Sequence, residues 1–276
     1  SNLNTIFTQR QRIYDIDFLK MLRDILRFNR NAPKDVARYG STEKATIGLG
    51  EYLDQERYDP YFQSRYLLPM AGAIWSCPIS EIRKFPLKFF VYFCENHGLL
   101  SILNRPQWFS VKGGSKSYID AMLSFTKDNA ISFKKNTQAL SIKDTSSGLE
   151  ITTQEINKKQ YFINCDHIVL ASHADESAKI LSPMDHAMTE QLSKIKFQVN
   201  TAVIHEDESL MPKSISAWSS WNYLSHAAIE ENPRIAVTYF MNKLQNLPTN
   251  RNLFVTLNPL KRINPVKLYK SIQYSH

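Results

Sequence analysis

The chain has 276 residues, of which 43% are hydrophobic and 22% charged, and its formal net charge is +8. This length and composition are those of an ordinary globular protein with one large domain or two smaller ones, and they exclude an intrinsically disordered chain. The excess of positive charge could favour an anionic partner, such as nucleic acid, a membrane surface or a ligand, but we favour the interpretation that it only keeps the protein soluble. The basic residues form no aromatic-interleaved patch and no known binding signature, so we expect no nucleic acid partner.

Three cysteines, Cys77, Cys94 and Cys165, lie in apolar sequence and lack the CxxC spacing. This pattern is typical of reduced, buried thiols in a cytoplasmic protein, and it predicts neither disulfides nor a metal site. No apolar run approaches the roughly 18 residues that a membrane span needs. The first residues also lack the apolar core of a signal peptide.

Residues 16–31 predict a strongly amphipathic helix, because apolar residues recur at spacings of three and four while basic residues line the opposite side. The apolar residues are Phe18, Leu19, Leu22, Ile25 and Leu26, and the basic residues are Lys20, Arg23, Arg27 and Arg30. The helix could lie on anionic lipid, or it could pack on the core with a solvated basic face, which we favour. We expect Pro33 and Gly40 to end it.

The chain up to Gly98 is predicted to be mostly helical. A loop and a short helix over residues 41–58 precede helices over residues 61–70 and 79–95, which a turn separates, and Asn96-His97-Gly98 supplies a stop. Gly48-Leu49-Gly50 begins like the dinucleotide fingerprint GxGxxG, but the third glycine and a preceding apolar strand are missing. We therefore expect these glycines to shape the start of a helix.

From Gln107 onward the pattern becomes mixed. A short strand over residues 107–111 leads to Gly113-Gly114 and to a helix over residues 115–126, with Tyr118, Met122 and Phe125 at its apolar positions. Short strands over residues 131–133 and 139–142 precede a hairpin of residues 149–153 and 160–163. Residues 167–171, HIVLA, predict a strand buried on both faces, and a helix follows through Leu181.

The last part of the chain predicts an antiparallel sheet. After a helix to about Lys194, runs rich in valine, threonine and aromatic residues cover positions 199–205, 215–221, 235–241 and 253–257. Residues 258–276 begin as a proline-bounded loop and end in a strand or a helix.

Few residues carry a recognisable chemistry of their own. The hydrolytic motifs GxSxG and HExxH are absent, as is the P-loop. The seven histidines are scattered singly, and we expect structural roles for them; His173, which follows the predicted buried strand, is the candidate for cofactor contact. Gly113-Gly114 suits either an anion bound at a helix amino end or a plain tight turn.

Nine blocks of sequence run in order along nearly the whole chain. They are MLRDILRFNR, YLLPMAGAIWSCP, NHGLLSILNRPQW, VKGGSKSYI, IVLASHADESAKIL, LMPK, WSSWNYL, VTYFMNKLQ and LFVTLNP. Together these blocks resemble the flavin-containing amine oxidase and phytoene-desaturase-like superfamily, and within it a bacterial subgroup of predicted NAD/FAD-binding oxidoreductases. The resemblance does not rest on one short motif.

This resemblance implies an α/β fold, with an α+β substrate domain and part of a Rossmann-like FAD-binding domain in a two-domain flavoprotein. The expected parts are residues 1–105 (helical substrate domain), 106–183 (partial FAD-binding domain), 184–258 (antiparallel sheet of the substrate domain) and 259–276 (truncated carboxyl-terminal segment). The aromatic-rich and glycine-rich stretch from Tyr66 to Tyr118 would cross between the two domains.

The resemblance also implies FAD as cofactor, no metal, and a set of site residues. The expected cofactor-binding residues are Trp108, Gly113, Gly114, Gln138, Ala139, Ala171 and Ser172. The candidates that line the flavin and substrate cavity are Trp221, Tyr223 and Tyr239.

The chain also departs from the family pattern. It lacks the amino-terminal GxGxxG unit that holds the FAD pyrophosphate and the carboxyl-terminal segment that completes the flavin pocket, so we expect an internal fragment. Monoamine oxidases of the superfamily hold a lysine near flavin N5. The run over residues 199–205 has Asn200 and Thr201 there instead, which weakens the case for amine oxidation.

Two functions are consistent with these observations. The first is an FAD-dependent oxidoreductase that moves hydride between an apolar, lipid-like substrate and flavin N5, in the cytoplasm or at the periphery of the inner membrane. The second is a non-catalytic fragment or binding module that cannot hold FAD by itself and purifies as a colourless or weakly yellow, aggregation-prone protein. The sequence predicts no oligomeric state.

Overall fold

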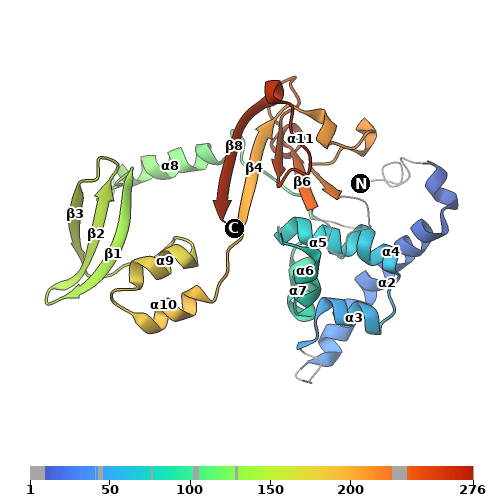
Figure 1. Ribbon diagram of the computed structural model, residues 1–276, viewed down its shortest axis with the longest axis horizontal. Coiled ribbons are helices and arrows are strands. Elements are labelled where there is room, and N and C mark those ends of the chain that lie inside the picture. Colours follow the sequence, from blue (N-terminus) through green and yellow to red (C-terminus); the bar gives the residue numbers. More distant parts are fainter. Residues whose placement is uncertain are drawn as a thin grey trace. The chain divides into compact units, whose positions relative to one another are not determined.

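A computed structural model describes residues 10–40, 42, 46–75, 77–101, 106–127, 130–225 and 235–275. The chain divides into two compact units, of which the first comprises Ser1–Ser115 and Val199–Tyr274 and the second Lys116–Gln198. Each unit contains helices and an antiparallel sheet (Figure 1), which confirms the mixed α/β class.

The amino-terminal part of the first unit is helical (Figure 1). Its elements are η1 (Arg10–Tyr14), α2 (Ile16–Tyr39), α3 (Leu49–Gln55), α4 (Pro60–Phe62), the π-helical turn η3 (Gln63–Leu67), α5 (Leu68–Trp75), α6 (Ile79–Lys84) and α7 (Leu87–Asn96). As predicted, Gly48 caps the start of α3, and Gly98 follows α7 with a φ of 63°.

Helix α2 is longer than predicted, and its most buried residues differ from the predicted apolar ones, of which Ile25 packs against the core. The Asp15 side chain caps its start by accepting from the Phe18 N–H, and it runs through Pro33 to end at Gly40. Its buried residues are Asp24, Phe28, Ala32, Val36 and Tyr39. Leu19 and Leu26, which were predicted to face the core, are 45% and 53% exposed. Packing of the carboxyl-terminal members of this buried set outweighs the single hydrogen bond that Pro33 removes.

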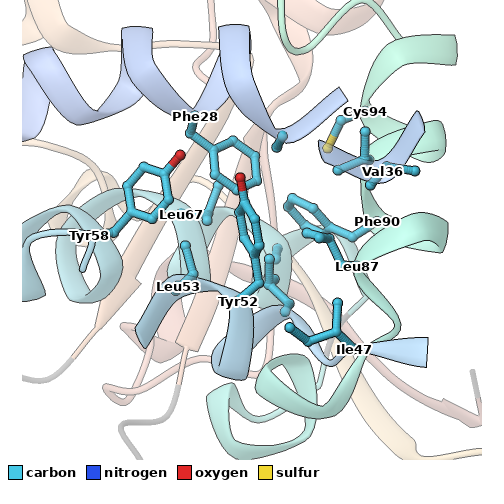
Figure 2. Close-up of a cluster of buried hydrophobic side chains, with 14 of the residues drawn as sticks. Phe28, Val36, Ile47, Tyr52, Leu53, Tyr58, Leu67, Leu87, Phe90 and Cys94 are labelled. Carbon is cyan, nitrogen blue, oxygen red and sulfur yellow. The ribbon is translucent and has the colours of Figure 1, made fainter. Parts of the chain in front are cut away.

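A cluster of buried rings joins the helices of the first unit. Figure 2 shows Phe28 of α2 facing Tyr52, Tyr58 and Phe90. Its ring centroid lies 6.2 Å from that of Tyr52, 5.7 Å from that of Tyr58 and 6.1 Å from that of Phe90. Because these rings come from segments far apart in the sequence, their burial is what brings α2, α3 and α7 together.

Two predicted helix boundaries in this region are wrong. The predicted turn after Met70 is helical through Trp75, since α4, η3 and α5 follow one another without a break. The predicted helix over residues 79–95 is interrupted at Phe85 and Pro86. A residue before proline favours extended backbone, and the Phe85 carbonyl there accepts from the Leu49 N–H at 2.8 Å.

The sheet of the first unit contains β4 (Val199–His205), β5 (Trp221–Ser225), β6 (Ile235–Phe240), β7 (Phe254–Leu257) and β8 (Leu268–Ser275), in the order β5-β6-β7-β4-β8. Short elements connect them: η4 (Glu208–Leu210), η5 (Ile215–Ala217), α11 (Met241–Gln245) and η6 (Pro265–Lys267). The pairs β5–β6, β6–β7 and β4–β7 are antiparallel, as predicted. The predicted strand over residues 215–221 is wrong, because η5 occupies its first residues and β5 begins only at Trp221.

The second unit contains α8 (Ser115–Lys127), the antiparallel strands β1 (Thr137–Thr145), β2 (Gly148–Glu155) and β3 (Gln160–Cys165), and the helices α9 (Ala174–Leu181) and α10 (His186–Ser193). The predicted hairpin is confirmed as β2 and β3, and α8 matches its predicted range. The predicted apolar positions of α8 are nevertheless exposed, with Tyr118 at 47%, Met122 at 61% and Phe125 at 70%.

Three predicted strands, over residues 107–111, 131–133 and 167–171, are wrong. A strand needs a partner for its backbone hydrogen bonds, and no described segment pairs with any of them. The run HIVLA was predicted to be buried on both faces, yet Val169 within it is 90% exposed.

Candidate functional site

Three aromatic residues predicted for the cavity lie together on one side of the first unit's sheet. Trp221 is directly opposite Tyr239 in the β5–β6 pair, and Tyr223 is two residues further along β5. Side chains alternate along a strand, so all three project to the same side. The Trp221 and Tyr239 rings meet edge to face, with centroids 5.3 Å apart. We call Trp221, Tyr223 and Tyr239 the aromatic face.

The aromatic face is half-open and uncharged. Trp221 is 50% and Tyr223 45% exposed, while the Tyr223 hydroxyl donates to the backbone carbonyl of Arg65 in η3. Burial of the hydroxyls raises the pKa of Tyr223 and of Tyr239. Both phenols therefore stay protonated at neutral pH, where they can donate hydrogen bonds but cannot act as bases. Such a surface suits an apolar or planar ligand.

The opposite side of the same strands carries a buried set of polar residues that the sequence did not single out. We call His205, Thr256, Thr238 and Asn222 the polar ladder; they are 0%, 0%, 1% and 7% exposed. The signal in the sequence that could have indicated these residues is the alternation of polar and apolar side chains along the strands. Asn222 lies between Trp221 and Tyr223, and Thr238 lies between Val237 and Tyr239.

Gly113 and Gly114 form a tight turn at the amino end of α8. Their φ angles are 83° and 75°, a region that favours glycine, and the Gly114 N–H donates to the Val111 carbonyl at 2.9 Å. The first turn of α8 has no acidic side chain, and a Cβ added at Gly114 would meet no atom within 4 Å. The free N–H groups of α8 are thus open to an anion.

Trp108 precedes this turn and is 67% exposed. Its ring stacks on that of His97 with centroids 6.2 Å apart, and His97 stacks in turn on Phe93 at 4.0 Å. The contact of Trp108 with a cofactor stays a prediction.

The remaining predicted cofactor residues belong to the second unit. Gln138 and Ala139 lie in β1 opposite Gln154 and Thr153 of β2, next to an irregularity in the register. Ala171 and Ser172 are exposed residues just before α9, and the hydroxyls of Ser172 and Ser177 are 2.8 Å apart. Among the described residues, no hydrogen bond or ring contact joins the first pair to the second, so their shared role stays a prediction.

His173 and Asn200 show how the structure treats two other candidates. His173 caps α9 and stacks on Phe197 with centroids 4.8 Å apart, so a structural contact already holds its ring. Asn200 in β4 is 2% exposed, and its side-chain oxygen accepts from Asn258 at 2.7 Å. The sequence has no lysine at this point of β4, where monoamine oxidases of the superfamily hold one near the flavin. The buried carboxamide of Asn200 lies there instead.

The structure excludes Gly48-Leu49-Gly50 as a nucleotide loop. Gly48 caps α3, Leu49 and Gly50 are buried, and a Cβ at Gly50 would come within 2.8 Å of Arg83. Arg83 in turn donates to Gln63 at 2.9 Å and Asp54 at 2.6 Å. These glycines therefore serve helix packing.

The thiols of Cys77 and Cys94 show no sign of activation. Burial raises the pKa of Cys77 to about 11 and that of Cys94 to about 12, so both stay protonated at neutral pH. Within the part of the chain that the structure describes, no three His, Cys, Asp or Glu side chains gather as metal ligands would.

The described helices include none that is both long and apolar enough to cross a bilayer. On α2, Leu19 and Leu26 are exposed, whereas Asp24 holds Arg23 at 3.1 Å and lies 3.9 Å from Arg27. The packing of α2 on the core confirms the interpretation that we favour. Contact of α2 with anionic lipid, the other alternative, stays a hypothesis that liposome flotation can test.

The sequence of the chain matches the model of a known protein family. The family model described as "Flavin containing amine oxidoreductase" matches residues 19–234, which include most of both units. A search of curated proteins found no match.

Proposed function

The chain belongs to the family of flavin-containing amine oxidoreductases, and from this premise we propose that it acts in an FAD-dependent oxidoreductase that moves hydride between an apolar substrate and flavin N5. The observation that carries the proposal is the aromatic face, a half-exposed and uncharged surface on the first unit's sheet, of which Trp221 and Tyr223 lie within the matched residues 19–234. The flavin would supply the hydride-transfer chemistry, which the side chains of the aromatic face do not provide.

The described residues fit part of such a cofactor. The open amino end of α8 beside Gly113 and Gly114 suits a phosphate, and the aromatic face suits a planar ring or an apolar substrate. The three-glycine turn that cradles a pyrophosphate is not found in the described ranges, where the one similar sequence starts α3.

The protein's own contribution in this proposal is positioning and exclusion of water. Trp221 and Tyr239 would hold an apolar substrate by contact with their rings, and Tyr223, anchored on Arg65, would fix the wall beside them. Their neutral hydroxyls and the carboxamide of Asn200 supply no general base. We therefore propose a substrate whose oxidation does not depend on a protein base at this face.

A titration of the purified chain with FAD tests the proposal. We expect a visible flavin difference spectrum and saturable binding, and we expect Trp221→Ala or Tyr239→Ala to raise the Kd about fivefold through loss of about 1 kcal/mol of ring contact. Tyr92→Ala is the matched control, because Tyr92 is an aromatic residue of similar exposure (48%) on α7 outside the aromatic face. Equal affinities for W221A and Y92A would remove the aromatic face from the site.

The second candidate function is a non-catalytic binding module. It is favoured by the large apolar side chains that no described segment covers, among them Phe109 at 89% and Val169 at 90% exposure. Complete absence of FAD binding in the titration would favour this function over the oxidoreductase.

A further inference from the structure

The polar ladder crosses four neighbouring strands of the first unit. Asn222 of β5 is directly opposite Thr238 of β6, and Thr238 is directly opposite Thr256 of β7. His205 of β4 reaches Thr256 diagonally across the β4–β7 pair, with Nε2 and Oγ1 2.7 Å apart. Buried polar groups in such a position are costly unless they are hydrogen-bonded, so their partners define which register is stable.

The hydrogen bonds of the ladder have a fixed direction. The backbone N–H of Asp207 donates to His205 Nδ1 at 3.0 Å, so Nδ1 carries a lone pair and the ring proton is on Nε2. Nε2–H then donates to the Thr256 hydroxyl, whose own proton is left for the Thr238 hydroxyl at 2.8 Å. Asn222 completes the ladder by donating to the Thr238 carbonyl at 3.2 Å.

This arrangement requires a neutral His205. A proton on Nδ1 would point at the Asp207 N–H. The present hydrogen bond would then be replaced by two donors that face each other in a buried site. Phe254 covers the ring at a centroid distance of 5.6 Å. The charged groups around it are the Asp207 carboxylate, which favours the protonated ring, and Lys267 of η6, which in turn favours the carboxylate.

The ladder and the aromatic face are two sides of the same strands. Asn222 lies between Trp221 and Tyr223, and Thr238 directly precedes Tyr239. A register slip of one residue would move every side chain to the other side of the sheet. The hydrogen bonds of the ladder therefore hold the register in which Trp221 meets Tyr239.

We propose that His205 is a positioning residue for the aromatic face, and that protonation of His205 loosens the β5–β6–β7–β4 register and separates Trp221 from Tyr239. The proposal rests on the proposed function only in taking the aromatic face as the ligand-binding surface. It makes the site sensitive to acid without any titratable group on the aromatic face itself.

The direction of the pH effect follows from burial, which lowers the pKa of His205 below its ordinary value of 6.5 despite the opposing effect of Asp207. The unfolded chain then binds the proton more readily than the folded one. The contribution of His205 to stability is complete at pH values above the ordinary pKa of histidine. It is lost as the pH falls below that value and through the lower pKa of the folded state.

The test uses the whole chain with its tryptophans replaced by fluorotryptophan. The chain has four tryptophans, and each gives a separate fluorine resonance. Trp221→Phe assigns the resonance of the aromatic face. We expect the Trp221 resonance to move or broaden between about pH 7.5 and about pH 5, and the urea midpoint to fall over the same range. His205→Gln keeps an acceptor and a donor but does not titrate, so both changes should disappear. No flavin or substrate is needed, so failure here is distinct from failure of the proposed function.

His186→Gln is the matched control, because His186 is an exposed residue at the start of α10, and it should behave as the wild-type chain does. Should H205Q not fold, Thr256→Val and Thr256→Ser replace it. The valine removes the hydroxyl between His205 and Thr238, so the Trp221 resonance should no longer respond to pH. The serine keeps this hydroxyl, so the response to pH should remain. A Trp221 resonance that titrates in H205Q as in the wild type, or that stays unmoved while the urea midpoint falls, overturns the proposal.

Discussion

At the scale of single residues, the most consequential buried charge is Asp24 on α2. Its side chain is fully buried, yet it accepts from the Asp59 backbone N–H at 2.8 Å and from Arg23 at 3.1 Å, with Arg27 3.9 Å away. Asp59 caps α4, so the carboxylate joins the middle of α2 to the start of α4. This is a long-range tertiary role for a residue that looks like part of a solvated helix face in the sequence.

We expect Asp24→Ala to lower the free energy of unfolding by about 3 kcal/mol, because it leaves the Asp59 N–H without its acceptor and removes the buried carboxylate that pairs with Arg23 and Arg27. Urea unfolding monitored by circular dichroism measures the loss. Asp17→Ala on the same helix is the control: its side chain is 60% exposed and pairs with Lys20 at 3.4 Å, so a change within about 0.5 kcal/mol is expected. Equal losses in D24A and D17A would contradict the role of Asp24.

At the scale of elements, the sequence predicts an element well where its own pattern suffices. The hairpin of β2 and β3 alternates around a polar turn and pairs with its neighbour in sequence, and β4 matches its predicted range. Residues 167–171 fail for the opposite reason. An apolar run can have an extended backbone without being a strand. Whether it forms a strand depends on a pairing segment elsewhere in the chain, and the local sequence does not reveal that segment.

The candidate site divides in the same way. Trp221, Tyr223 and Tyr239 could be predicted from the resemblance of their sequence blocks, but their meeting on one side of the sheet depends on the β5–β6 register. His205 looked like one more isolated histidine, since nothing local to it indicates the Thr256 hydroxyl 51 residues away. A polar contact across such a separation is determined by the fold, not by the pattern around either residue.

The exposed apolar side chains of α8 and of residues 167–171 lead to a prediction about self-association. Because Phe125 is 70% and Val169 90% exposed, F125S and V169T remove apolar surface from water without opening a cavity. We expect less self-association by static light scattering and a free energy of unfolding unchanged within about 0.5 kcal/mol. Phe28→Ala, which truncates a ring with 1% exposure, should cost about 3–5 kcal/mol in the same assay. A loss in F125S comparable to that in F28A would show that Phe125 is buried in solution.

At the scale of the whole molecule, the two units differ in how much apolar side chain they bury. The core of the first unit includes Phe28, Tyr52, Phe62 and Phe90, all at most 1% exposed. In the second unit, the buried apolar residues of the described ranges are Ile142, Ala178 and Leu181. Since burial of apolar surface is the main favourable term in folding, the second unit should be the less stable of the two.

We therefore expect unfolding in two steps, with the second unit losing its structure at the lower urea concentration. Hydrogen exchange of the intact chain, read by mass spectrometry on peptides from β1–β3 and from α3–α7, separates the two steps. Peptides from β1–β3 should exchange fully while those from α3–α7 remain protected. Phe28→Ala sharpens the comparison, because it should shift the midpoint of the α3–α7 peptides and leave that of β1–β3 unchanged. One common midpoint for both sets of peptides, moving together in F28A, would show that the chain folds as a single cooperative unit and that burial within each unit does not set its stability.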